Sequence, residues 1–282
     1  MKIFKSKKAL QDYIERQKEM GKKIGFAPTM GALHQGHISL YEAAKKENDL
    51  VISSIFVNPT QFNNIADLEK YPRDPNRDIK LLEKSGVVDA VYLPEIIDLY
   101  PEGLESKSYD FDGLENEMEG KFRPGHFDGV GTVVETLLMQ VKPDNAYFGE
   151  KDYQQLTIIK KLVTKLKMPI KIHGVPIYRE KNGLAMSSRN ERLSADQREA
   201  SKVIYETLLK VNEWFRIITL SEINKRIEDI FHDQRGMVLE YFSIADESTL
   251  KETDFFYKGH KYRAFIVVFV NEVRLIDNIH LS

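Results

Sequence analysis

Residues 23–40 read KIGFAPTMGALHQGHISL, an apolar run that passes through glycines and two histidines into a helical pattern. Residues 23–27 predict a buried strand, and the glycines let the backbone approach a ligand closely. The helix that follows would direct free N–H groups and the positive end of its dipole toward an anion. His34 and His37 would lie where phosphate charge collects. The stretch predicts an anion-binding corner of an α/β fold, although a plain strand-to-helix turn with capping imidazoles is the alternative.

The composition sets broad limits on function. The 282 residues are 42% hydrophobic and 30% charged, enough for a sizeable core and for two domains. A formal net charge of −2 gives no general attraction to nucleic acid or to an anionic membrane, so we expect neither partner. The absence of cysteine excludes disulfides, thiolate metal sites and a cysteine nucleophile. No stretch reaches the roughly 20 apolar residues of a membrane span, and we expect a cytoplasmic protein.

Between residues 22 and about 177, short β-branched runs alternate with longer amphipathic ones, the pattern of a parallel α/β sheet. The strands are predicted at 23–27, 50–57, 90–93, 146–148 and 170–177. The helices are predicted at 38–47, 76–85, 133–140 and 154–166. Asp74-Pro75 is a suitable helix start and Gly86 a suitable stop. We therefore expect a Rossmann-like N-terminal domain over residues 1–177.

After about residue 180 the pattern changes. Residues 194–197 predict a capping box that opens a long helix to about residue 214, and a second helix is predicted at 221–232. Strands are predicted at 238–244, 262–270 and 273–276, the last two joined by the turn-like Asn271-Glu272. These elements predict a smaller α+β domain over residues 178–282.

Ligands of parallel sheets gather at the carboxyl ends of the strands. The strand at 50–57 is followed by Asn58 and Gln61, whose amides suit a small polar carboxylate or hydroxyl substrate. The alternative is that Asn58 starts a turn and Gln61 is solvated.

Residues 148–156, FGEKDYQQL, again lead from a strand into a helix. Gly149 permits close approach, Lys151 supplies a mobile charge for phosphate, and Asp152 can cap the helix or hold ribose hydroxyls. Gln155 lies one turn further along and can face the same cleft. A charged helix start without a ligand is the alternative.

Residues 179–190, REKNGLAMSSRN, place two hydroxyls and a guanidinium close together on a loop. Ser187, Ser188 and Arg189 make a compact phosphate clamp. An unspecialised surface loop is the alternative. We expect Asn182-Gly183 to act as a hinge that lets this loop close over a nucleotide.

The motifs together resemble known enzymes. His-x-Gly-His at 34–37 resembles the HIGH signature of the nucleotidylyltransferase superfamily, and residues 186–189 resemble its KMSKS-type loop, with Ala185 in place of the first lysine. The chain from 26 to 193 is similar to the pantothenate synthetase family, as shown by PTMGALHQGH, FVNPTQF, YPRDPNRD, FRPGHFDGVGTVV, FGEKDYQQL and GLAMSSRN.

The resemblance implies a ligase that joins pantoate to β-alanine. ATP and pantoate would give pantoyl adenylate and pyrophosphate, and the β-alanine amine would then displace AMP. Because the adenylate is itself the activated acyl group, no enzyme nucleophile is required. Family members are usually homodimers, so the resemblance also implies a homodimer.

The resemblance further implies which residues form the site. It assigns the amides of Gln61 and Gln155 to pantoate, with Gln61 also near β-alanine. The expected catalytic residues are His34, His37, Lys151 and Arg189. The implied ATP contacts are Met30, Gly31, Ala32, Leu33, His34, Gln35, Gly36, His37, Gly149, Glu150, Lys151, Asp152, Tyr178, Met186, Ser187, Ser188 and Arg189.

The expected metal is Mg²⁺ carried by ATP. Asp78 matches an acidic family position near the nucleotide's metal, although Arg77 stands where some members have a second aspartate. The spacing of His34 and His37 can suit Zn²⁺, but no third strong ligand is evident nearby.

Other functions remain as alternatives. A nucleotidylyltransferase that acts on another small acceptor is the nearest one, but amides at the acceptor positions argue against a phosphorylated acceptor. An RNA-binding synthetase-like protein is disfavoured by the near-neutral charge, and a silent ATP sensor by the retained polar positions. Arg123 and His126 either approach the β-alanine or phosphate side of the site or belong to a structural turn.

Overall fold

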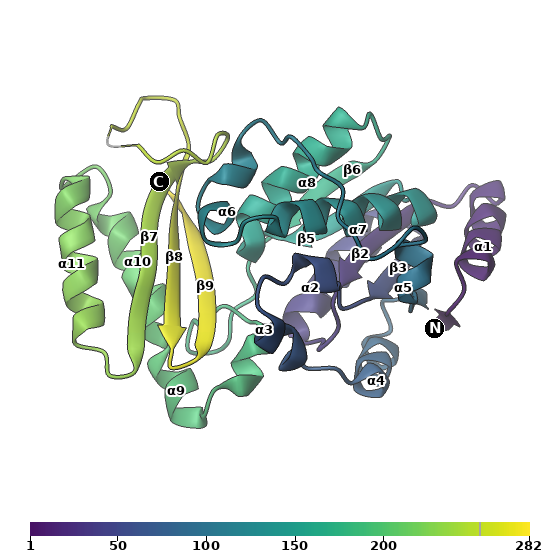
Figure 1. Ribbon diagram of the computed structural model, residues 1–282, viewed down its shortest axis with the longest axis horizontal. Helices are drawn as coiled ribbons and strands as arrows, with labels where there is room; N and C mark the ends of the chain where they lie inside the picture. Colours follow the sequence, from purple (N-terminus) through teal and green to yellow (C-terminus); the bar gives the residue numbers. More distant parts are fainter. Residues whose placement is uncertain (254) are drawn as a thin grey trace. The chain divides into compact units, whose positions relative to one another are not determined.

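The computed structural model describes residues 1–253 and 255–282, which divide into two compact units. The N-terminal unit comprises Met1–Glu150 and Gln154–Pro176. The C-terminal unit comprises Ile177–Ser282 together with the short segment Lys151–Tyr153. Figure 1 labels the elements of each unit along the chain.

The N-terminal unit is built on a six-stranded parallel sheet of order β1-β4-β3-β2-β5-β6. The Rossmann-like α/β fold predicted from the sequence is therefore confirmed. The strands are β1 (Lys2–Phe4), β2 (Ile24–Thr29), β3 (Leu50–Ile55), β4 (Ala90–Tyr92), β5 (Asn145–Gly149) and β6 (Lys171–Val175). The longer helices are α1 (Lys7–Glu19), α2 (Gln35–Glu47), α4 (Pro75–Ser85), α7 (His126–Val141) and α8 (Tyr153–Lys165). Shorter helical turns are η1 (Pro59–Gln61), α3 (Ile65–Glu69), α5 (Ile96–Leu99), η2 (Leu114–Asn116), α6 (Glu119–Phe122) and η3 (Glu150–Asp152).

The strand order has a switch point between β2 and β5. From β2 the chain continues outward through β3 and β4, whereas β5 pairs with the opposite side of β2 and continues to β6. Loops that follow the two strands at such a point leave the sheet in opposite directions and open a crevice at its carboxyl edge. The loop after β2 carries the paired histidines, and the residues after β5 begin with Glu150. The topology therefore places two of the predicted motifs at the usual ligand position of this fold.

Burial explains why these strands form. Ile24, Phe26 and Ala27 in β2 and Val51 and Ile52 in β3 are completely buried, as expected for central parallel strands covered on both faces.

Helix α4 begins where the sequence predicted, because the Asp74 side chain accepts the Arg77 N–H and Pro75 is the first helical residue.

Helix α7 corrects the predicted boundaries most clearly. It begins at His126 rather than at 133. Its added first turns contain Gly129 and Gly131, which face close neighbours: a Cβ at Gly129 would lie 2.6 Å from the Thr60 carbonyl oxygen, and one at Gly131 would lie 2.9 Å from the Tyr109 ring. Gly129 lets α7 pack tightly against η1, Gly131 makes room for the Tyr109 and Phe111 rings, and neither glycine ends the helix.

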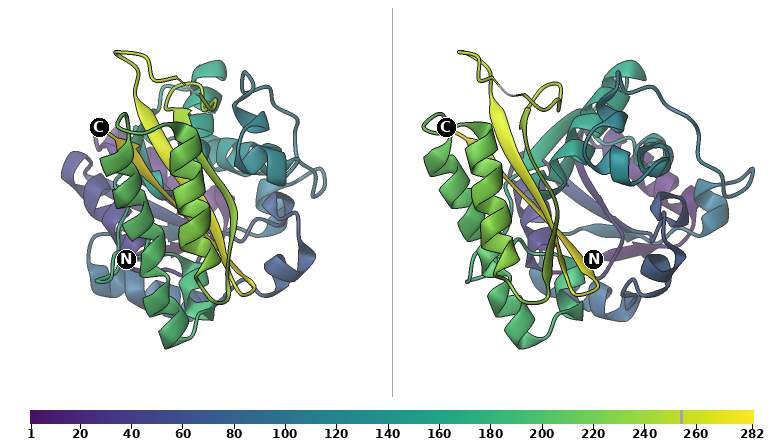
Figure 2. Two further views of the ribbon diagram at one scale, coloured as in Figure 1. Left: turned by 90° about the vertical axis from the view of Figure 1, so that its left-hand side faces the viewer. Right: turned by 60° about the vertical axis from the view of Figure 1, so that its left-hand side comes forward.

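The C-terminal unit is a three-stranded antiparallel sheet of order β7-β8-β9, consistent with the predicted α+β elements. Figure 2 shows α10 and α11 lying together against this sheet. The elements are η4 (Ser188–Arg192), α9 (Ala195–Ala200), α10 (Lys202–Trp214), α11 (Leu220–His232), β7 (Met237–Asp246), β8 (Tyr262–Val270) and β9 (Val273–Leu281).

Two differences from the predicted C-terminal elements have local causes. The single helix expected from Ser194 is broken at Ser201, whose hydroxyl donates back to the Gln197 carbonyl at 2.7 Å and bends the chain. Strand β9 continues past the predicted end at 276 to Leu281. The polar pair Asp277-Asn278 resembles a turn in sequence, yet both residues are buried in the strand.

Candidate functional site

The loop after β2 is held from two sides within the N-terminal unit. The Thr29 hydroxyl donates to the Ser54 carbonyl at 2.8 Å, which ties the end of β2 to β3. The backbone N–H groups of Ala32 and Leu33 donate to the two carboxylate oxygens of Asp78 at 2.9 and 2.7 Å. Gly31 has a φ of +81°, and a Cβ there would lie 2.9 Å from the Asp78 carboxylate. The loop conformation therefore depends on glycine at 31 and on the carboxylate at 78.

Asp78 lies in the first turn of α4 and is 1% exposed. Burial raises the pKa of its carboxyl, while the N–H bonds from Leu33 and Ala32 act to lower it. Each oxygen already accepts one backbone N–H, so these contacts define an anchor for the loop. Metal binding by Asp78 stays a prediction.

The two histidines meet at the N-terminus of α2. Their ring centroids lie 4.0 Å apart. The His34 backbone N–H donates to His37 Nδ1 at 3.2 Å, so Nδ1 is the acceptor nitrogen of that ring. A neutral imidazole with Nδ1 as acceptor carries its proton on Nε2. His37 is thus held in the tautomer that can donate a hydrogen bond to an anion at the helix N-terminus.

In the loop after β3, the two predicted amides contact each other, because Asn58 Nδ2 donates to Gln61 Oε1 at 3.3 Å, but their other partners differ. Asn58 is buried, donates to the Gly129 carbonyl at 3.1 Å, and accepts the Tyr100 hydroxyl at 2.6 Å. Through these bonds the Asn58 side chain holds η1 against α7. Gln61 lies at the end of η1, and its side-chain nitrogen contacts Met30 Sδ in the loop after β2. Among the predicted polar residues of this loop, Gln61 is the one that reaches the histidine-bearing segment.

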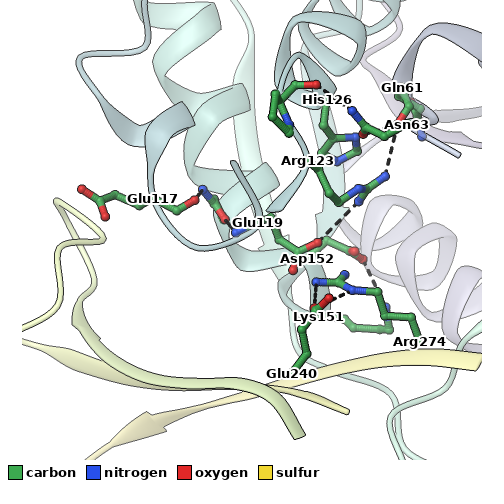
Figure 3. Close-up of polar contacts among 12 residues, drawn as sticks. Gln61, Asn63, Glu117, Glu119, Arg123, His126, Lys151, Asp152, Glu240 and Arg274 are labelled. Atoms are coloured by element: carbon green, nitrogen blue, oxygen red, sulfur yellow. Dashed lines mark hydrogen bonds and ion pairs between the residues drawn. The ribbon is translucent and has the colours of Figure 1, made fainter. Parts of the chain in front are cut away.

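Arg123 and His126 support Gln61 through its backbone. Both donate to the Gln61 carbonyl oxygen, Arg123 through Nη2 at 3.1 Å and His126 through Nδ1 at 2.8 Å (Figure 3). Arg123 also pairs with Glu119 at 3.4 Å. The sequence left a ligand role and a structural turn open for these two side chains. Their contacts give them a positioning role that sequence reasoning did not find, because it depends on packing between distant segments.

The two neighbouring glutamines of α8, Gln154 and Gln155, differ in whether their side-chain amides are hydrogen-bonded within the protein. Gln154 is buried and uses its whole amide, donating to the Leu114 and Glu117 carbonyls and accepting the Glu119 N–H. The Gln155 side chain is half-buried and makes no hydrogen bond to any residue that the structure describes. Binding of a ligand by the Gln155 amide stays a prediction.

In the C-terminal unit, residues 179–193 form a tight hairpin that carries the two hydroxyls and Arg189. Glu180 and Leu184 pair through their backbones, and Ser187 accepts the Arg189 N–H at 3.3 Å at the start of η4. Met186 N–H donates to the carbonyl of Tyr178, whose side chain is 44% exposed. Met186 and Ser187 thus lead directly into η4, which begins with the buried Ser188 and continues with Arg189.

The expected hinge at Asn182-Gly183 stays a prediction, and several hydrogen bonds link this turn to the rest of the C-terminal unit. The Asn182 side chain donates to the Arg198 carbonyl at 3.1 Å, and the Glu180 carboxylate accepts both Arg198 Nε at 2.6 Å and the Asn190 amide at 2.7 Å. Gly183 has a φ of +93° because it turns the hairpin. Hydrogen bonds on both sides of this turn join the loop to residues 190–199 of the same unit.

Lys151 belongs to the short segment that joins the C-terminal unit. Its side chain is 18% exposed, and Nζ lies 3.7 Å from the Asp152 carboxylate (Figure 3). The Lys151 carbonyl accepts the Asn278 amide at 2.8 Å. A lysine that shares a unit with a hairpin of hydroxyls suits phosphate recognition.

Among residues 1–253 and 255–282, no group of three or more histidine or carboxylate side chains is arranged to hold a metal ion. Within the same residues, no helix is long and apolar enough to cross a bilayer.

The fold and these contacts define the class: a parallel α/β enzyme whose strand-end loop and helix N-terminus are organised for an anionic ligand. A model of the pantoate–β-alanine ligase family matches residues 2–280. Pantothenate synthetases from Christiangramia forsetii and Flavobacterium psychrophilum are each 50% identical over 282 residues, covering 100% of both chains. The chain belongs to the pantoate–β-alanine ligase family.

Solved structures agree. The pantothenate synthetase of Thermus thermophilus superimposes with a TM-score of 0.90 at 38% identity, over 99% of each chain. The pantoate–β-alanine ligase of Francisella tularensis, solved with β,γ-ATP and β-alanine, superimposes with a TM-score of 0.82 at 40% identity, over 99% of this chain and 97% of that one.

Proposed function

We propose that this chain condenses pantoate with β-alanine at the expense of ATP, releasing AMP and pyrophosphate. Family membership over nearly the whole chain is the observation that carries the proposal. The anion-binding loop, with His37 oriented as a donor, supplies chemistry that such a reaction needs. The ligase of Francisella tularensis that was solved with β,γ-ATP and β-alanine supports the choice of ligands.

The reaction divides into two displacements. A carboxylate oxygen of pantoate attacks the α-phosphorus of ATP, the bond from that phosphorus to the bridging oxygen breaks, and pyrophosphate leaves. The β-alanine nitrogen then attacks the acyl carbon of pantoyl adenylate, loses a proton, and displaces AMP. Negative charge grows on the phosphate oxygens in the first step, so preorganised donors are the main requirement.

The proposed ATP contacts come from several backbone and side-chain groups. His37 Nε2 and the N-terminal N–H groups of α2 donate to phosphate oxygens, with His34 beside them. Lys151, Ser187, Ser188 and Arg189 add positive charge and hydroxyl donors. Further contacts are proposed for Met30, Gly31, Ala32, Leu33, Gln35, Gly36, Gly149, Glu150, Asp152, Tyr178 and Met186.

Pantoate is proposed to bind through two amides. Gln61 is placed by Arg123, His126 and the packing of α7, and Gln155 presents an amide that no described residue uses. Neutral amides can donate to a carboxylate or a hydroxyl without the strong charge that a phosphorylated acceptor would call for. The same Gln61 amide is proposed to lie near β-alanine.

Mg²⁺ is proposed to enter with ATP as part of the substrate. It would neutralise phosphate charge during the first step. Asp78 has both oxygens engaged by backbone N–H groups, so its main proposed role is to shape the loop. A homodimer, a cytoplasmic location, the absence of a nucleic-acid partner, a nucleotide- and pantoate-binding domain at 1–177 and a lid domain at 178–282 stay predictions.

Pyrophosphate release from Mg-ATP tests the function. Pantoate alone should support one slow round of release, β-alanine should accelerate it, and mass spectrometry should find pantothenate. Replacing pantoate by a phosphorylated acceptor tests the nucleotidylyltransferase alternative. No pantoate-dependent release from a folded protein that binds ATP would overturn the proposal.

A further inference from the structure

Two consecutive buried polar residues occur in β9 of the C-terminal unit. Asp277 is 3% exposed and Asn278 is 2% exposed. The other polar residues of this strand, Arg274 and His280, are at least partly exposed, whereas burying a carboxylate and an amide is costly unless their hydrogen bonds are satisfied. Their partners lie on two segments that are far apart in sequence, namely the 179–193 hairpin and the Lys151–Tyr153 segment.

Asp277 holds the hairpin through Arg179. Its two oxygens accept Arg179 Nη1 at 2.6 Å and Nη2 at 3.0 Å, a two-pronged ion pair. The same guanidinium lies 3.6 Å over the ring of Tyr205 and donates to the Gly183 carbonyl at 3.0 Å. Arg179 is therefore fixed on three sides, and the hairpin that begins there carries Ser187, Ser188 and Arg189.

Asn278 holds the segment that contains Lys151. Its Nδ2 donates to the Lys151 carbonyl at 2.8 Å. Its Oδ1 accepts Arg263 Nη1 at 2.6 Å, which fixes the orientation of the amide. Arg263 also lies 3.9 Å over the ring of Tyr153. Lys151–Tyr153 is thus fastened at its first and last residues to the same sheet.

The ionisation of Asp277 depends on the positive charges of Arg179 and Lys151. Burial raises the pKa of Asp277, whereas the Arg179 guanidinium, the Asn278 N–H and the Lys151 ammonium act to lower it. Lys151 and Arg179 therefore both stabilise the ionised carboxylate. Strand β9 therefore contacts both the Arg179 segment and the Lys151 segment, and the positive charges of both stabilise the Asp277 carboxylate.

We propose that Asp277 and Asn278 are positioning residues that set Lys151 and the Ser187–Ser188–Arg189 turn in one fixed arrangement for phosphate. The inference rests on the proposed function, because it assigns those groups to ATP. Misplacement of such groups by about 1 Å lowers the rate by up to about 100-fold, and mainly through the transition state.

Two substitutions test the two connections separately. Asn278→Ala removes the bond to the Lys151 carbonyl, while Arg263 keeps its pairing with Glu247 at 2.9 Å. Arg179→Lys leaves a positive charge beside Asp277 but removes the forked geometry and the planar contact with Tyr205. In pyrophosphate release well below each melting temperature, kcat should fall at least tenfold, with the KM for pantoate within about threefold of wild type.

The matched control changes the stability of the same unit without touching either connection. Ile227 in α11 is completely buried in the hydrophobic core of the C-terminal unit. Ile227→Val should lower the melting temperature slightly and Ile227→Ala more strongly, because they remove different amounts of buried side chain. Both controls should keep the wild-type kcat at temperatures where they are folded. An equal loss of kcat in a control of matched melting temperature would overturn the positioning role.

A second readout does not depend on activity. Trypsin cleaves after Lys151 at the carbonyl that Asn278 holds, so Asn278→Ala should speed cleavage there, and Ile227→Val should not. If the wild type were inactive but Asn278→Ala still sped trypsin cleavage after Lys151, the proposed function would be wrong while the contact between Asn278 and Lys151 would stand. Unchanged cleavage with kcat within about twofold of wild type would defeat the positioning role, as would failure of both Asn278→Ala and Arg179→Lys to fold.

Discussion

Single side chains in the loop after β2 have separable tasks. His37 uses Nδ1 to accept the His34 N–H, which leaves Nε2 as a donor. Asp78 uses both oxygens to hold the Ala32 and Leu33 N–H groups. His37 is thus oriented for the donor role proposed for it, whereas Asp78 shapes the loop, and substitutions that keep one atom and remove another can distinguish these tasks.

His37→Asn should abolish most activity while preserving the fold. The asparagine oxygen can replace Nδ1 as acceptor, but no donor remains at the position of Nε2. Loss of one donor to a developing oxyanion lowers kcat by about 100- to 1000-fold. His37→Ala should show the same kinetic loss and lose about 1 kcal/mol of stability as well, because the His34 N–H is left without its acceptor. Pyrophosphate release and thermal melting measure the two effects, and near-normal turnover in His37→Asn would contradict the donor role.

Asp78→Asn should destabilise the loop. The new amide can accept one N–H but presents its own N–H groups to the other, leaving a buried donor unsatisfied at a cost of about 1–3 kcal/mol. We expect a lower melting temperature and weaker ATP binding in calorimetry. Raising Mg²⁺ should not restore activity if the carboxylate is an anchor. Restoration by Mg²⁺ would instead support the metal role predicted for Asp78.

At the scale of elements, packing of α7 on η1 determines where Gln61 lies. Gly129→Ala would place a methyl group 2.6 Å from the Thr60 carbonyl oxygen and 2.9 Å from the Gln61 Cα, both on the backbone. Because backbone cannot rotate away, η1 must move, and overpacking of this kind costs about 1–3 kcal/mol. We expect a raised KM for pantoate. Gly131→Ala is the control, since its methyl group meets the Tyr109 and Phe111 rings; an equal rise in KM there would exclude an effect through Gln61.

The same scale shows what the sequence can predict. Every strand of the two sheets except β1 was predicted, because apolar runs of β-branched residues mark buried strands. The sequence did not predict that α7 begins at His126, because the first turns contain Gly129 and Gly131, which disfavour a helix and are explained only by close contact with Thr60 and Tyr109, far away in sequence. The true end of β9 was missed because Asp277-Asn278 has the composition of a turn.

The candidate site was predictable to a similar degree. The glycines and histidines of the loop after β2 form a local pattern, so short-range chemistry revealed them. The support of Gln61 by Arg123 and His126, and the commitment of Asn58 to the helix packing, involve partners dozens of positions away. No periodicity encodes such contacts, and only the folded chain brings them together.

For the molecule as a whole, acid stability should depend on Asp246. Its carboxylate accepts the Ser248 hydroxyl, the ring N–H of His260, and the backbone N–H groups of Ser248 and Thr249. Burial opposes ionisation, but these hydrogen bonds outweigh it and hold the pKa of Asp246 at about 2, below the value of about 3.9 for an unfolded chain. Since the unfolded chain binds the proton more readily, this contribution is complete above about pH 4 and is lost as the pH falls toward 2.

Urea unfolding between about pH 2 and 6 measures this dependence. Asp246→Asn should be less stable than wild type at neutral pH and should show a smaller fall in the free energy of unfolding between about pH 4 and 2. Glu228→Gln, an exposed change on α11, should retain the wild-type slope. Identical slopes for wild type and Asp246→Asn would contradict the assignment.

The path of the chain between the two units has a consequence for dissection of the molecule. Lys151–Tyr153 belongs to the C-terminal unit, whereas the residues just before and just after it belong to the N-terminal unit. No single cut of the backbone can therefore release either half complete. A fragment beginning at Ile177 would lack the peptide that covers the Asn278 amide and the Arg263 guanidinium, and would expose two buried polar groups. Separately expressed halves should thus be poor folders, and a split version of this enzyme needs a break inside a surface loop of one unit.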